Sequence, residues 1–270
     1  MKTFFYALMI LATVLTTGCK QSKKTSLPDQ PGQTGQTVVE PASTVSALGY
    51  EVERFVTDGG KPVDITLIKH GTLAIDFEGV SIHIDPVIQL GKTTNYATDF
   101  PKADFILITH EHGDHLDAEA IEALTAEKTR LIVNEKSYEK LGEGETIANG
   151  EILPLTDDIT LEAVPAYNTT PGREKFHPKG NGNGYLLTID GLLIYIAGDT
   201  EVIPEMADLK DIDVAFLPVN QPYTMTVEQC VNAAKTINPK VLIPYHFGDT
   251  DLSELPSLLP GIDVRLRQMQ

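Results

Sequence analysis

The sequence predicts a single α/β domain in which two packed β-sheets are covered by helices. Three short β-branched runs lead the domain, strand-like and helix-like segments then alternate, and neither a second linker nor an internal repeat interrupts them. The chain has 270 residues, of which 41% are hydrophobic, so it is long enough and apolar enough to bury a core. Length and composition therefore favour a globular protein over a disordered one.

Three predicted strands open the domain. Val63 to His70, Thr72 to Phe77 and Val80 to Ile84 are rich in residues that favour extended backbone, and the pairs His70-Gly71 and Glu78-Gly79 separate them. Successive strands joined by such short turns are typical of a β-meander.

The later segments alternate between strand and helix. Helical spacing of apolar residues predicts a helix from Asp117 to Thr125 and another from Val227 to Ile237, the second with Thr226 as its N-cap and Asn238-Pro239 as its stop. Further strands are predicted at Phe105 to Thr109, Leu131 to Asn134, Ile159 to Val164, Tyr185 to Ile189, Leu192 to Ala197, Val214 to Pro218 and Val241 to Ile243.

The charge balance limits the choice of partners. The chain carries 38 acidic and 21 basic residues, for a formal net charge of −17. Proteins that bind nucleic acid or anionic membranes need clustered Lys and Arg, so we expect neither as a main partner. Solubility is the simpler explanation for the same charge, and the partner that we expect is a small-molecule substrate.

The N-terminus is typical of an export signal. Met1-Lys2 is followed by an apolar run from Phe4 to Leu15, which is too short to span a bilayer as a helix. The following Leu15-Thr16-Thr17-Gly18-Cys19 resembles a bacterial lipobox, so we expect residues 1–18 to be a lipoprotein signal peptide and Cys19 to be lipidated. An ordinary cleaved signal with an incidental cysteine is the alternative. Lipidation would anchor the protein to a membrane of the bacterial cell envelope, facing outside the cytoplasm.

A tether is expected to follow the signal. Residues 19–45 are rich in Gln, Thr, Ser, Gly, Pro and Lys and carry too little apolar surface to offset the entropy of ordering. The folded domain is therefore expected to cover residues 46–270.

The segment 110–115 reads His-Glu-His-Gly-Asp-His and is a dense group of potential metal ligands. His110 and His112 alternate at the end of a predicted strand, so their rings can face the same side, and Gly113 allows a tight turn that returns Asp114 and His115 toward them. Imidazole and carboxylate ligands suit zinc, and they also suit iron or manganese.

The pattern His-x-His-x-Asp-His after an apolar strand resembles the signature of the metallo-β-lactamase fold. Three more positions match that family in its order along the chain: Asp85 in Ile-His-Ile-Asp-Pro, Asp199 in Ile-Ala-Gly-Asp-Thr, and His246 in Ile-Pro-Tyr-His-Phe-Gly. The resemblance covers residues from about Val63 to Phe247 and implies a four-layer αββα sandwich. The segment from Pro218 to Thr226 looks most like the branch with ascorbate-phosphate lactonases and N-acylphosphatidylethanolamine phospholipases.

The resemblance also implies a role for each matching residue. Asp85 would orient the site from behind, and Asp199 would bridge two metal ions. The other implied ligands are His110 and His112 for the first metal, and Asp114, His115 and His246 for the second.

One motif departs from the family pattern. The family supplies a third histidine to the first metal after the strand that ends near Val164, but this chain has Asn168 there, and asparagine is a poor zinc ligand. His177 is the remaining histidine in that segment and could reach in from the loop. Otherwise it contacts substrate or nothing, and the site works with one ion.

The remaining candidates lie near the expected site or in the core. His70 either lies beside the metals or is a structural turn residue, and His83 is expected to be a hydrogen-bonded residue of a sheet. Cys230 has helical spacing typical of a core position and is expected to be inert. Candidates for substrate contact are Tyr167, Asn168, Asn220 and Tyr223.

Together these residues predict a metal-dependent hydrolase, with two zinc ions expected and manganese or iron as alternatives. Two ions can lower the pKa of a bridging water toward about 7, and Asp114 would accept or deliver the proton. We expect cleavage of an ester-type bond, in a carboxylic ester, a lactone or a phosphodiester. The alternatives are an iron-dependent thiol oxidoreductase of the same fold and a non-catalytic binding lipoprotein.

Overall fold

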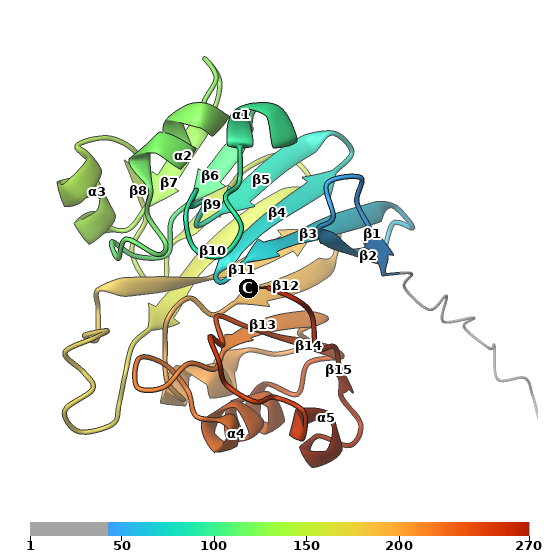
Figure 1. The fold of residues 1–270 in the computed structure, drawn as a ribbon, viewed down its shortest axis with the longest axis vertical. Helices are drawn as coiled ribbons and strands as arrows, with labels where there is room; N and C mark the ends of the chain where they lie inside the picture. Colours follow the sequence, from blue (N-terminus) through green and yellow to red (C-terminus); the bar gives the residue numbers. More distant parts are fainter. Residues whose placement is uncertain (1–42, 270) are drawn as a thin grey trace, which may run out of the picture. The chain divides into compact units, whose positions relative to one another are not determined.

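The computed structural model describes residues 43–269 (Figure 1). The predicted signal peptide, the lipidation site at Cys19 and nearly all of the predicted tether lie outside these residues. Among the described residues, no helix is both long and apolar enough to cross a membrane.

The first sheet has eight strands that follow one another in chain order. The strands from β1 to β5 pair antiparallel, and those from β5 to β8 pair parallel. Their bounds are β1 Thr44–Val45, β2 Glu51–Val56, β3 Pro62–Lys69, β4 Thr72–Phe77, β5 Val80–Ile84, β6 Phe105–Leu107, β7 Arg130–Val133 and β8 Glu145–Thr146.

The second sheet has seven strands, which run from β9 to β15 in chain order. Here β9 to β12 pair antiparallel and β12 to β15 pair parallel. Their bounds are β9 Ile152–Pro154, β10 Ile159–Ala166, β11 Gly182–Ile189, β12 Leu192–Ile196, β13 Val214–Pro218, β14 Val241–Tyr245 and β15 Asp263–Val264.

Helices cover the outer side of each sheet (Figure 1). Apolar residues of α1 and α2 pack on the first sheet, and those of η1, α4 and α5 pack on the second. The bounds are α1 Tyr96–Asp99, α2 Ala118–Leu124, α3 Glu135–Leu141, η1 Pro204–Asp208, α4 Val227–Ile237 and α5 Leu255–Leu258. The predicted α/β class and the four-layer αββα sandwich are therefore confirmed.

The strand β13 shows why some runs are apolar throughout. Val214 and Phe216 enter the core between the sheets, whereas Ala215 and Leu217 pack under the helices. A strand buried on both faces needs apolar residues at every position. The central strands therefore lose the alternation that marks the half-exposed strands.

The boundary predicted for the tether needs correction. The tether was expected to extend to residue 45, but Thr44 and Val45 pair with β2 and belong to the first sheet. Both side chains are exposed, so the pairing of β1 rests on the main chain and a burial pattern does not mark it. Cys230 lies in the core as expected, and burial raises the pKa of its thiol to about 12.

His83 was expected to be hydrogen-bonded, and this is wrong. The ring is fully buried on β5 with no hydrogen-bond partner, and it packs edge-on against Phe100 and Tyr96, with ring centroids 5.2 and 6.0 Å away. Burial lowers the pKa of His83 to about 4, so the ring is neutral at pH 7. His83 therefore behaves as an aromatic core residue.

Candidate metal centre

The candidate ligands gather where loops leave the two sheets. His70 follows β3, the segment from His110 to His115 follows β6, Asp199 follows β12, and His246 follows β14. His177 comes from the long loop between β10 and β11. Residues from both sheets therefore meet at one end of the sandwich.

Three histidines form a first ligand group. His110, His112 and His177 each offer a nitrogen, and these nitrogens lie within 4.8 Å of one another. His110 Nε2 and His112 Nδ1 are 3.1 Å apart. His177 Nδ1 donates to the Tyr223 carbonyl oxygen at 3.1 Å, which leaves Nε2 facing the group. The structure thus brings His177 to the place where the family's third histidine was expected.

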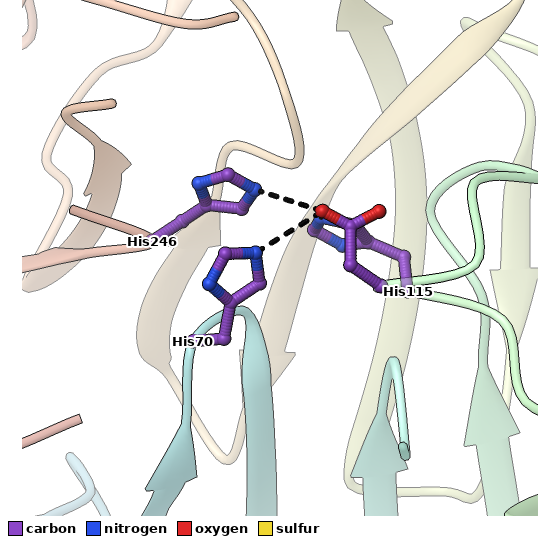
Figure 2. Close-up of side chains that lie close together, drawn as sticks. His70, His115 and His246 are labelled. Carbon is purple, nitrogen blue, oxygen red and sulfur yellow. Dashed lines mark hydrogen bonds and ion pairs between the residues drawn. The ribbon is translucent and has the colours of Figure 1, made fainter. Parts of the chain in front are cut away.

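Three more histidines and one aspartate form a second ligand group: His70, Asp114, His115 and His246. Figure 2 shows the three imidazoles converging from different elements. Asp114 Oδ2 lies 3.2 Å from His70 Nε2 and 3.6 Å from His246 Nε2. Of the two roles considered for His70, the structure favours the one beside the metals.

Asp199 joins the two groups. Its carboxylate oxygens lie 3.2 Å from His177 Nε2, 3.2 Å from His246 Nε2 and 3.3 Å from His115 Nε2. Its side chain is only 3% exposed, whereas that of Asp114 is 38% exposed. Asp199 is therefore placed to bridge, and Asp114 is the carboxylate that a substrate could reach.

Asp85 holds the centre from behind. It is fully buried and accepts hydrogen bonds from the Thr109 amide at 2.7 Å, the Thr109 hydroxyl at 2.6 Å and His115 Nδ1 at 2.7 Å. Thr109 Oγ1 in turn lies 3.0 Å from His110 Nδ1. One carboxylate thus orients a histidine of each group, in the manner of the outer residues that support metal ligands.

Close packing also fixes His115. A Cβ atom added at Gly71 would lie 2.7 Å from His115 Cε1, so only glycine fits against this ring. The turn that carries His70 therefore also packs directly against the His115 ring.

The unpaired atoms at this centre fit a metal ion. His115 Nε2, His177 Nε2, His246 Nε2 and Asp199 Oδ1 are buried and have no aligned hydrogen-bond partner. Leaving such atoms unpaired is costly, and their lone pairs are suited to coordinate a metal ion. The donors of both groups are imidazoles and carboxylates, which are ligands for zinc, iron or manganese.

The electrostatics of the centre favour positive charge. Burial would raise the pKa of Asp114, but the neighbouring imidazoles of His246 and His70 hold it below its ordinary value. Burial would also raise the pKa of Asp199, yet the charges of His246 and His115 hold it well below. Both carboxylates are therefore ionised and can compensate a cation.

The other predicted residues support the centre or lie away from it. Asn168 is buried, and its amide donates to the carbonyl oxygens of Tyr223 and Arg173, so it holds the loop that carries His177. Asn220 lies beside Gly248, shortly after His246 along the chain. Substrate contact by Asn220 and Tyr223 remains a prediction.

Tyr167 was expected to contact substrate, and the structure places it elsewhere. Its hydroxyl donates to Glu205 at 2.8 Å and accepts from Lys179, and its ring packs in the core under the helices of the second sheet. The side chain next to Asn168 therefore points to the opposite side, as alternation along an extended segment requires.

Sequence reasoning missed two residues that shape the centre. Thr109 links Asp85 to His110, and its position just before the first histidine was the available signal. Glu201 is fully buried and accepts from the amides of Thr169 and Thr170 at 2.8 and 2.6 Å, which fixes the start of the His177 loop. No sequence pattern marked Glu201, because its shortest hydrogen bonds come from main-chain amides and its side-chain partners, Arg173 and Thr169, lie about thirty residues away.

Two packed sheets with a histidine and aspartate centre at one end define a class of protein, the metal-dependent hydrolases with the metallo-β-lactamase fold. Known proteins agree with this class. The family profile described as a beta-lactamase superfamily domain matches residues 64–246. The chain is 33% identical over 193 residues to a UPF0173 metal-dependent hydrolase of Pyrococcus furiosus, covering 68% of this chain and 84% of that protein.

Solved structures extend the similarity. A metal-dependent hydrolase from Parabacteroides distasonis has 56% identity and a TM-score of 0.79, covering 82% of this chain and all of that one. A metallo hydrolase from Ignicoccus hospitalis has 25% identity and a TM-score of 0.64, covering 77% and 95%. The chain belongs to the metallo-β-lactamase superfamily and, within it, to the UPF0173 metal-dependent hydrolases.

Proposed function

We infer that this metal-dependent hydrolase uses two metal ions, most suitably zinc, to cleave an ester-type bond in a small molecule. The observation that carries this inference is Asp199. It lies within 3.3 Å of histidines from both ligand groups, so one carboxylate can serve two ions. Mn²⁺ and iron fit the same donors.

The residues divide the work as follows. His110, His112 and His177 would hold one ion, His70, Asp114, His115 and His246 the other, and Asp199 both. Bound ions would supply a water of lowered pKa and polarise the bond to be cut.

Asp114 is the residue proposed to move the proton. It is ionised, and its side chain is accessible to solvent, whereas the side chain of Asp199 is buried. His70 and His246 lie on one side of Asp114 Oδ2 and fix its orientation. A positioned carboxylate of this kind can accept a proton from the attacking water and return it to the leaving group.

Substrate would enter beside Tyr223. Its side chain is 46% exposed, and its ring stacks edge-on with Phe176, the neighbour of His177, at a centroid distance of 5.2 Å. This aromatic pair offers an apolar surface next to the first ligand group. A carboxylic ester, lactone or phosphodiester with an apolar portion fits these surroundings, and the resembled lactonase and phospholipase branch cleaves bonds of these kinds.

An Asp114→Asn variant tests the proposal. Loss of the general base should lower kcat by about 10²- to 10⁴-fold on a panel of chromogenic esters, lactones and phosphodiesters. Far-UV circular dichroism should stay unchanged, and the metal content is measured alongside, because Asp114 is also a residue of the second ligand group. Asp157→Asn, at an exposed turn position, is the matched control. Full activity in Asp114→Asn would refute the proton-transfer role, and no turnover of any panel member by the wild type would refute the bond class.

The membrane anchor is a separate proposal that rests on the lipobox-like residues alone. Lipidated Cys19 would hold the enzyme in the cell envelope, facing outside the cytoplasm. Cys19→Ser should move the protein from the membrane fraction to the soluble fraction and remove the mass of the acyl chains. An unchanged membrane fraction would refute lipid anchoring through Cys19.

A further inference from the structure

The chain returns to the metal centre after its last strand. We call residues 265–269 the C-terminal strap. Figure 1 shows the dark red end of the chain running from β15 back toward the middle of the fold. Met269 is fully buried in the core between the sheets, and its carbonyl oxygen accepts a hydrogen bond from the His70 amide at 2.5 Å. The strap therefore ends directly behind a residue of the second ligand group.

His70 depends on such contacts because its backbone is in a costly conformation. Its φ is +47°, in the left-handed region that residues other than glycine rarely adopt. The His70 amide is held by Met269, and its carbonyl oxygen accepts from the His246 amide at 2.9 Å. His246 itself has a φ of +46°, and the two imidazole centroids are 3.7 Å apart. Two strained ligand positions thus support each other, and the strap supports the first of them.

The strap has an anchor of its own. Glu53 on β2 is fully buried, and it accepts hydrogen bonds from Arg265 Nη1 and Arg267 Nε, each at 2.5 Å. A buried carboxylate is costly unless it is paired, so this pair of arginines fixes where the strap crosses the first sheet. The Gln268 amide adds a contact to Glu51.

We propose that the C-terminal strap is a positioning element of the metal centre, which holds the turn at His70 so that its ring reaches the second ligand group. The proposal rests on the proposed role of His70 at that group. The anchor at Glu53 sets the path of the strap, Met269 fixes its end, and the Met269 carbonyl oxygen holds the His70 amide. None of these groups belongs to either ligand group.

The test is a double-mutant cycle read out as Zn²⁺ affinity. The variants are removal of residues 267–270, His70→Ala, and the two combined, and the dissociation constant of each ion is measured by competition with a chromophoric chelator. We expect the deletion and His70→Ala each to weaken one of the two ions by about 10- to 100-fold. The combined variant should bind no more weakly than His70→Ala alone, because the strap acts through that residue.

Arg54→Ala is the matched control. It removes an exposed ion pair with Asp64 from the same strand and should leave Zn²⁺ affinity unchanged. If the deletion variant does not fold, Arg267→Ala takes its place in the cycle. Arg267→Lys should then recover part of the Zn²⁺ affinity that Arg267→Ala loses.

Three results would overturn the proposal. The first is wild-type Zn²⁺ affinity in both the deletion and Arg267→Ala. The second is a combined variant whose loss of affinity equals the sum of the losses in the deletion and in His70→Ala, and the third is wild-type affinity in His70→Ala itself. A wild-type protein that binds a single ion would instead refute the proposed dinuclear function. Failure of the proposed function is therefore seen in the wild type, and failure of the strap proposal is seen in the variants.

Discussion

The two ligand groups of the centre are built differently. The first consists of three imidazoles, and one of them, His177, comes from a long loop, where its ring donates to the Tyr223 carbonyl oxygen and its own carbonyl oxygen accepts from the Asn168 amide. The second contains its own carboxylate, Asp114, and its histidines are held by a buried aspartate and by main-chain hydrogen bonds. We expect the second group to bind its ion more tightly, because it has more negative charge and is more rigidly held.

Asp199→Asn should have the largest effect, because it removes the one carboxylate that lies next to both ligand groups. The variant removes the negative charge that both ions would share and leaves buried imidazoles facing a neutral amide. We expect both ions to be lost and kcat/KM to fall on the order of a thousandfold. Metal analysis and ester hydrolysis by the purified variant check this. Retention of two ions would show that Asp199 does not bridge.

His177→Ala should empty the first group alone. A domain that begins before Thr44, so that β1 is kept, and is purified without added metal should hold about two zinc ions per chain as wild type. The variant should hold about one, because it removes one of the three histidines of the first group. Metal content by mass spectrometry is the measurement. One ion in both proteins would remove His177 from the site, and iron in place of zinc would favour the redox alternative.

Asp85→Asn should weaken the second group without emptying it. The amide cannot accept all three hydrogen bonds that Asp85 receives, so the His115 ring loses its fixed orientation. We expect about a 10- to 100-fold weaker affinity for the more tightly bound ion, measured by chelator competition. Asp76→Asn, an exposed position on β4, is the control. Unchanged affinity would mean that packing against Gly71 alone orients His115.

Tyr223→Ala should have the smallest effect and should leave both groups loaded. His177 is held by the main-chain carbonyl of this residue, which the substitution keeps. Loss of the exposed ring should raise KM about fivefold, or about 1 kcal/mol, with kcat unchanged. Tyr138→Ala, at another exposed tyrosine on α3, should leave KM unchanged. A loss of metal in Tyr223→Ala would show that the ring supports His177.

The sequence predicted the strands and helices that have a clear apolar pattern and missed those that do not. Val214–Pro218 and Val227–Ile237 have the predicted bounds, and the capping box at Thr226 is present. The strand Glu51–Val56 was missed because its buried face carries Glu53, which is neutralised by arginines more than two hundred residues later. The helix Glu135–Leu141 was missed because its single buried residue is a serine.

The candidate site shows the same division. Local motifs identified His110, His112, Asp114 and His115, since these ligands lie close in sequence. The roles of His70 and His177 stayed open because they depend on a left-handed turn and on a loop held by main-chain contacts. Such contacts join groups that every residue carries, so they leave no mark on residue type.

The hydrogen bond between the His246 amide and the His70 carbonyl oxygen joins the segment after β14 of one sheet to the turn between β3 and β4 of the other. Because closing so long a loop is entropically costly, we expect this contact to form late in folding. Interactions that are absent from the folding transition state act on the rate of unfolding. Metal should therefore leave the speed of folding almost unchanged and lengthen the lifetime of the folded enzyme, which is the quantity that protects a protein from proteases.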